Sequence, residues 1–226
     1  MLLVRPGHSL TDARGEFMGP GRCRGVDRTG LAQVKLLGRS LASMQLQLSR
    51  IYHTDVARAE DTANILAASL GGLPLEAALR CRHYGDADGK LVDEVLATFD
   101  PPLELSPSIP LAEGAETWMQ VVQRTRRELE QITDRHSGET VLVVCDQDTI
   151  AASFQLYLDA SAKRSQSIRT SNTAITEWLM THYLDAEDDS RQPQWVLVRH
   201  NDGAHLAGPV TTGLRREDSL QPFCPS

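Results

Sequence analysis

Short apolar runs alternate along the chain with segments in which apolar residues recur at helical spacing. The run Thr140 to Cys145 is the clearest strand, because Val-Leu-Val-Val lacks polar alternation and is typical of a strand covered on both faces. The other predicted strands are residues 1–5, 50–54, 173–180 and 195–200. Helical spacing predicts helices over residues 30–41, 56–70 and 118–132, and a fourth that begins near Thr149. This alternation predicts a three-layer α/β/α fold with a mostly parallel central sheet.

Two irregular segments interrupt this pattern. Residues 6–29 are rich in Gly, Arg and Asp and predict a long loop, of a length that usually serves a function. Residues 80–113 contain four prolines and predict an insertion over one end of the sheet. We expect residues 1–206 to form a single domain and residues 207–226, which lack periodicity, to form a mobile tail.

Composition narrows the classes of function. Thirty acidic residues against 23 Lys and Arg give a net charge of -7, without a basic run, which disfavours nucleic acid and acidic membranes as partners. No apolar stretch approaches the ~20 residues of a membrane-spanning helix, and the N-terminus lacks a signal-peptide pattern, so we expect a cytoplasmic protein. The four cysteines lack CxxC spacing and no metal-ligand spacing is evident, so neither a metal nor another cofactor is predicted.

Ligands of such sheets bind beyond the carboxyl ends of the strands. Three strand ends therefore mark the expected cleft, and they are residues 5–9, 54–58 and 145–148. A series of motifs links these ends in order. They are Leu-Val-Arg-Pro-Gly-His-Ser at 3–9, a helix from Gly30, Arg-Ala-x-x-Thr-Ala at 58–63, Leu-Arg-Cys-Arg-His-Tyr-Gly at 79–85, Glu116-Thr117 with Arg124, Val-Leu-Val-Val-Cys-Asp at 141–146 and Asn-Asp-Gly-Ala-His-Leu at 201–206.

Together these motifs resemble the histidine phosphatase superfamily, which includes the cofactor-dependent phosphoglycerate mutases. The resemblance spans nearly the whole chain and implies a phosphoglycerate mutase-like fold. It places the family's phosphorylated histidine at Pro6, its acid/base glutamate at Cys81 and its second histidine at Asp146. Proline offers no nucleophile, a thiol with a pKa of about 8.5 is a poor acid/base group at neutral pH, and a carboxylate opposes the transferring phosphoryl group. We therefore predict that phosphoryl transfer has been lost.

The resemblance leaves Arg5 and Arg58 as the retained ligand-binding groups. Asp146 is expected to face both and to neutralise part of the cleft. A small anionic or polar metabolite, such as a carboxylate, a zwitterion or a neutral ligand, or a protein partner then becomes a plausible occupant. The full set of predicted ligand-binding residues is Arg5, Arg58, Ser9, Arg22 and His83.

Two alternatives stay open. A repurposed enzyme would carry out isomerisation, dehydration, cyclisation or hydrolysis with Asp146 and either His8 or Cys81 as catalytic groups. A phosphatase or mutase with a relocated nucleophile is the second alternative. Capping of the following helix would also explain Asp146 and Asp148 without chemistry. A homodimer is compatible with such a fold.

Overall fold

The computed structural model describes residues 1–100, 102–103, 106–159, 168–184 and 191–207. Apart from residue 207, the predicted tail lies outside the described residues. A six-stranded sheet of order β3-β2-β4-β1-β5-β6 forms the centre. The strands are β1 (Leu2–Val4), β2 (Leu48–Thr54), β3 (Leu75–Leu79), β4 (Thr140–Val144), β5 (Ile175–Leu184) and β6 (Arg191–Asp202). Strands β3, β2, β4 and β1 pair in parallel, whereas β5 runs antiparallel to β1 and β6. The predicted α/β class with a mostly parallel sheet is confirmed.

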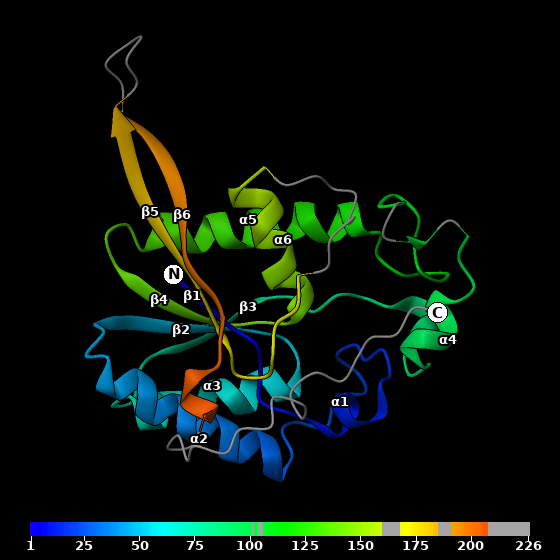
Figure 1. Cartoon of the computed structure of the whole chain (residues 1–226), viewed down its shortest axis with the longest axis horizontal. Coiled ribbons are helices and arrows are strands. Elements are labelled where there is room, and N and C mark those ends of the chain that lie inside the picture. Colours follow the sequence, from blue (N-terminus) through cyan, green and yellow to red (C-terminus); the bar gives the residue numbers. More distant parts are fainter. Residues whose placement is uncertain (101, 104–105, 160–167, 185–190, 208–226) are drawn as a thin grey trace.

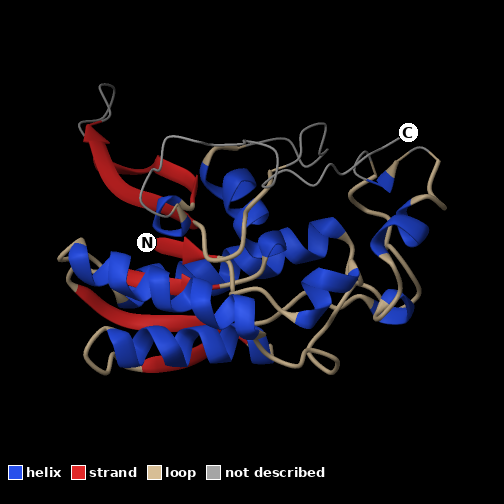
Figure 2. Cartoon of the chain, turned by 60° about the horizontal axis from the view of Figure 1, so that its bottom comes forward, coloured by secondary structure: helices blue, strands red, loops and turns tan. Residues whose placement is uncertain are grey.

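Two pairs of helices cover the two faces of the sheet, as Figures 1 and 2 show. Helices α2 (Arg28–Ser43) and α3 (Ala57–Ser69) pack on one face, and α5 (Trp118–Arg135) and α6 (Gln147–Tyr157) pack on the other. Successive side chains of β4 point to opposite faces, so that Leu142 and Val144 join the core under α2 and α3 while Val141 and Val143 join the core under α5 and α6. This double cover explains why β4 has no polar alternation.

The irregular segments contain short helices. Helix α1 (Leu10–Arg14) lies in the predicted long loop, and the predicted insertion contains a 3-10 helix (Gly85–Ala87) and α4 (Val92–Leu96). A second 3-10 helix (Ala204–Leu206) follows β6. None of the helices within the described ranges is long and apolar enough to cross a bilayer.

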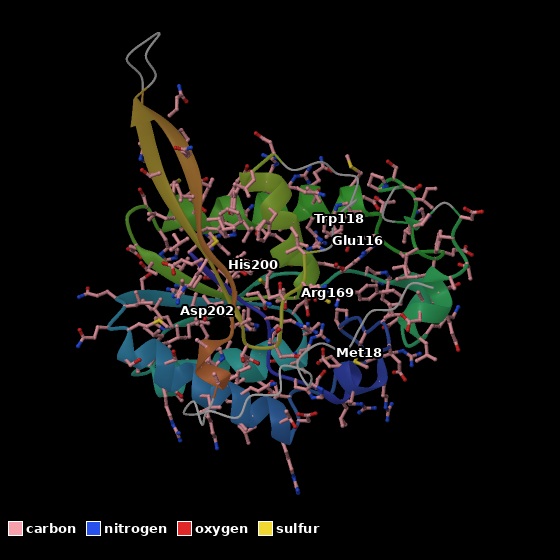
Figure 3. The ribbon with its side chains drawn as sticks, in the orientation of Figure 1. Met18, Glu116, Trp118, Arg169, His200 and Asp202 are labelled. Carbon is pink, nitrogen blue, oxygen red and sulfur yellow. The ribbon has the colours of Figure 1, made fainter. Side chains whose placement is uncertain are left out.

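A buried arginine fastens the insertion to α5. The Arg124 guanidinium donates to Glu116 Oε1 at 2.9 Å, to Glu128 Oε2 at 3.1 Å and to the Arg80 carbonyl at 2.8 Å. Glu116 comes just before α5, near Trp118 in Figure 3. These contacts hold the segment that follows β3 beside the carboxyl ends of the strands, where it contributes side chains to the expected cleft.

Candidate functional site

The strand ends of β2 and β4 bring Arg58 and Asp146 together. Arg58 lies in the first turn of α3, and Asp146 lies between β4 and α6. Arg58 donates to Asp146 Oδ1 from Nε at 3.1 Å and also from Nη2, while Thr54 Oγ1 donates to Asp146 Oδ2 at 3.3 Å. The two charged side chains are only 13% and 10% exposed. Burial alone would lower the pKa of Arg58, but the charge and hydrogen bond of Asp146, together with Cys81 and Cys23, raise that pKa on balance. The result is a buried ion pair.

Arg5, which follows β1, has a different partner. Its Nη2 donates to Asp12 Oδ1 at 2.7 Å, and its Nη1 donates to the Thr170 carbonyl at 2.6 Å and to Gln147 Oε1 at 3.3 Å. Ser9 donates to Asp12 Oδ2 from its backbone N at 2.9 Å and from Oγ at 2.6 Å. Burial would raise the pKa of Asp12, but the charge of Arg5 and the Ser9 hydrogen bonds lower it. Asp12 is therefore a carboxylate at neutral pH.

The expectation that Asp146 faces Arg5 as well as Arg58 is wrong. Asp12 lies on α1, only seven residues after Arg5. This short helix places the Asp12 carboxylate, in place of Asp146, against the Arg5 guanidinium. Ser9, a predicted ligand-binding residue, is buried and holds Asp12 in place.

A third ion pair comes from the insertion. Arg82 Nη1 donates to Asp148 Oδ2 at 3.3 Å, and Arg82 Nη2 donates to the Glu116 carbonyl at 3.1 Å. The Tyr84 hydroxyl donates to the same Asp148 oxygen at 3.5 Å. The side chain of Arg82 is 10% exposed and that of Asp148 is 19% exposed. Neither Arg82 nor Tyr84 is among the predicted site residues, although both lie in the motif that contains Cys81.

The first residues at the start of α6 contact all three arginines. Asp146, Gln147 and Asp148 are consecutive, and each contacts a different arginine. Each of the three arginines also pairs with a separate aspartate, and the formal charges within each pair cancel. The pairs are Arg58–Asp146, Arg5–Asp12 and Arg82–Asp148.

Helix capping does not explain Asp146. It occupies the N-cap position of α6, but its side chain makes no capping hydrogen bond. The carboxylate instead accepts from Arg58 and Thr54. Asp148 lies in the first turn of α6, where a negative charge interacts favourably with the helix dipole. It too binds an arginine, Arg82. Asp146 and Asp148 at this end of α6 therefore bind arginines of the expected cleft.

Two cysteines lie near the Arg58–Asp146 pair. Cys81 is buried, and burial, reinforced by the negative charge of Asp146 and a hydrogen bond to it, raises the pKa of its thiol well above the ordinary value. A protonated thiol is a weak nucleophile. Cys23 Sγ accepts from the backbone N of Arg58 at 3.3 Å and lies 3.8 Å from Arg58 Nη1. No sequence motif points to Cys23, apart from its place in the long loop.

His8 lies against the start of α2. Its Nδ1 is 2.7 Å from Oδ2 of Asp27, the N-cap residue of that helix, and its backbone N donates to Gln33 Oε1 at 3.0 Å. The other oxygen of Asp27 accepts from the Gly30 backbone at 2.9 Å. The imidazole is therefore oriented by a carboxylate.

His83 and Arg22 lie on exposed loops. His83 Nδ1 is 2.9 Å from the Gly114 carbonyl. Arg22 is 62% exposed and lies 3.6 Å from Asp88 Oδ2. Within the described part of the chain, no group of three or more His, Cys, Asp and Glu side chains is arranged to hold a metal ion.

Residues 1–201 match the model of the histidine phosphatase superfamily (branch 1), and the chain belongs to this superfamily. Two relatives from Arabidopsis thaliana are similar to it. Phosphoglycerate mutase-like protein 4 is 25% identical over 177 residues, which cover 76% of each chain. A metal-independent phosphoserine phosphatase is 24% identical over 217 residues, which cover 92% of this chain and 83% of the relative.

Solved structures show the same fold. A variant of the Entamoeba histolytica phosphoserine phosphatase, in complex with phosphoserine, superposes with a TM-score of 0.72 at 18% identity. The match covers 91% of this chain and 98% of that one. The predicted phosphoglycerate mutase-like fold is thereby confirmed.

Proposed function

We propose that this cleft binds a small polar metabolite and does not transfer a phosphoryl group through a histidine. The observation that carries the proposal is the pairing of Arg5, Arg58 and Arg82 with three aspartates. A phosphate dianion needs positive charge that is not already neutralised. Two like unit charges about 4 Å apart repel by about 4 kcal/mol at an effective dielectric constant near 20. A phosphate on Arg58 would meet such repulsion from Asp146.

The residues at the expected catalytic positions support the same proposal. Pro6 lies two residues after the end of β1 and has no side-chain donor, acceptor or nucleophile. Cys81 holds a protonated thiol where the resemblance expects a carboxylate. Asp146 brings a negative charge where phosphoryl transfer calls for a positive one.

A phosphate-release assay on the purified full chain tests the proposal. The substrates are phosphoserine and phosphoglycerate, taken from the names of the relatives. We expect wild type and Arg58→Ala to release phosphate at the same background rate. Turnover in the wild type that is lost in Arg58→Ala would contradict the proposal.

A second candidate is a phosphatase or mutase with a relocated nucleophile. The phosphatase and mutase names of the relatives favour it, and so does the Asp27 carboxylate 2.7 Å from His8 Nδ1, since a carboxylate often orients a reactive histidine. If the assay shows turnover, the variant His8→Ala tests whether His8 is the relocated nucleophile. Loss of turnover together with loss of an acid-labile phosphoenzyme would assign the nucleophile to His8, whereas unchanged turnover would exclude it.

A further inference from the structure

We infer that the ligand of the Arg58–Asp146 pair is a small zwitterion, with an ammonium group and a carboxylate one to three carbons apart. The inference rests on the proposed function and names the chemical class of its ligand. It follows from the charge state and burial of two side chains, and from the contacts that each side chain makes apart from its ion-pair partner.

Burial excludes singly charged ligands on energetic grounds. Arg58 and Asp146 are each about nine-tenths buried, and a buried charge that loses its partner is strongly destabilising. An anion bound to Arg58 would draw the guanidinium from Asp146 and leave that carboxylate beside a second negative charge. A cation bound to Asp146 would leave Arg58 without a counter-ion. A zwitterion supplies a partner to both groups at once.

The weakest contacts of the pair show where the two ends of the ligand would bind. Arg58 Nη1 lies 3.8 Å from Cys23 Sγ, and the Cys81 thiol is buried near Asp146, whose charge helps to raise the pKa of that thiol. Sulfur is a weak hydrogen-bond donor and acceptor. A ligand carboxylate that replaces Cys23 at Nη1, and a ligand ammonium that replaces Cys81 at the carboxylate, would exchange weak contacts for charge-assisted ones.

The geometry also limits the length of the ligand. The Arg58 guanidinium and the Asp146 carboxylate are in direct hydrogen-bond contact, so a molecule that binds both must carry its charges close together. The neighbouring arginines already have partners in Asp12 and Asp148. These two neighbouring pairs carry no net charge, so they should favour a ligand that is itself neutral overall.

Titration of the isotope-labelled full chain, followed by NMR, tests the inference at matched ionic strength. The zwitterionic probes are glycine, β-alanine and 4-aminobutyrate, and the singly charged probes are propionate and propylammonium, which have the chain length of β-alanine. We expect at least one zwitterion to bind at least tenfold more tightly than either singly charged probe. Arg58→Gln and Asp146→Asn should each abolish that preference. The exposed control Asp134→Asn, on α5, should keep it.

Each other outcome has one meaning. Propionate binding as tightly as β-alanine would overturn the inference, and so would a panel in which no zwitterion binds. Either result leaves the proposed function standing if the phosphate-release assay is negative. Preserved zwitterion preference in both Arg58→Gln and Asp146→Asn would place the binding site elsewhere and would also overturn the inference. Folding of the variants is read from the same spectra, so a loss of binding is not confused with a loss of structure.

Discussion

Asp146→Asn removes one charge from the cleft and almost no volume. Arg58 then stays buried without a counter-ion, since both of its donors to Asp146 point at a neutral oxygen. Breaking a buried ion pair from one side costs about 3–5 kcal/mol. The asparagine oxygen still accepts a hydrogen bond, so we expect a loss near the lower end, about 3 kcal/mol. In a chain of 226 residues, 1 kcal/mol shifts the Tm by about 2–4 °C, so the Tm should fall by about 6–12 °C.

The same variant should gain affinity for phosphate. With Asp146 neutral, Arg58 offers an uncompensated positive charge, and inorganic phosphate can provide the missing counter-ion. A ligand at a hundredfold excess over its Kd stabilises the folded state by about 2.7 kcal/mol. Phosphate should therefore restore most of the stability that Asp146→Asn loses, while it leaves the wild type unchanged.

Thermal unfolding followed by circular dichroism measures both effects. The buffers contain chloride or phosphate at equal ionic strength, and Asp134→Asn serves as an exposed, isosteric control. A Tm of Asp146→Asn within about 1 °C of wild type would refute the argument that the pair is energetically coupled. Equal stabilisation of wild type and variant by phosphate would refute the argument that the cleft is already neutral.

His200 should make stability depend on pH. Burial lowers its pKa, so the unfolded state takes up a proton first as the pH falls through about 6.5, and the free energy of unfolding should decrease there. Urea titrations at pH 5.5 and 7.5 should show a smaller difference in the free energy of unfolding between the two pH values for His200→Asn than for wild type. An equal difference in the two proteins would contradict the assignment to His200. Gly30→Ala should lower the Tm by several degrees, because the new Cβ would lie 2.1 Å from the carbonyl oxygen of His8. Gly21→Ala, whose Cβ would meet no atom within 4 Å, is the matched control and should leave the Tm nearly unchanged.

The layers of the fold were predictable because burial is visible in the sequence. The core-facing residues of α2 and α5 recur at helical spacing, and β4 is apolar from Val141 to its end. Strand β3 was missed, because Leu-Glu-Ala-Ala-Leu has neither β-branched residues nor full burial, and it becomes a strand by pairing with β2 at the edge of the sheet. Leu31 fits the helical spacing of α2 but is 38% exposed, since α2 begins at Arg28 and buries the face that contains Val34.

The cleft was predictable only in part. The strand-end rule brought Arg58 and Asp146 together, because β2 and β4 are adjacent and parallel. The partner of Arg5 depends on a five-residue helix that the apolar pattern does not show. Arg82 reaches Asp148 because the insertion is fastened to α5, a tertiary contact with no local signature.

Stability alone does not account for three arginine–aspartate pairs, one of them nine-tenths buried, beside the carboxyl ends of the strands. Replacing a buried ion pair by apolar residues of similar volume is often neutral or stabilising, so the pairs add little that a packed apolar cleft would lack. The loss expected for Asp146→Asn measures the cost of an orphaned Arg58 and not a net benefit of the pair. What the pairs do provide is a set of fixed donors and acceptors of both signs, held by α1, α3, the start of α6 and the segments that follow β1 and β3. We expect such a surface to discriminate against a ligand that carries only one sign of charge, which is the selectivity that a zwitterionic ligand requires.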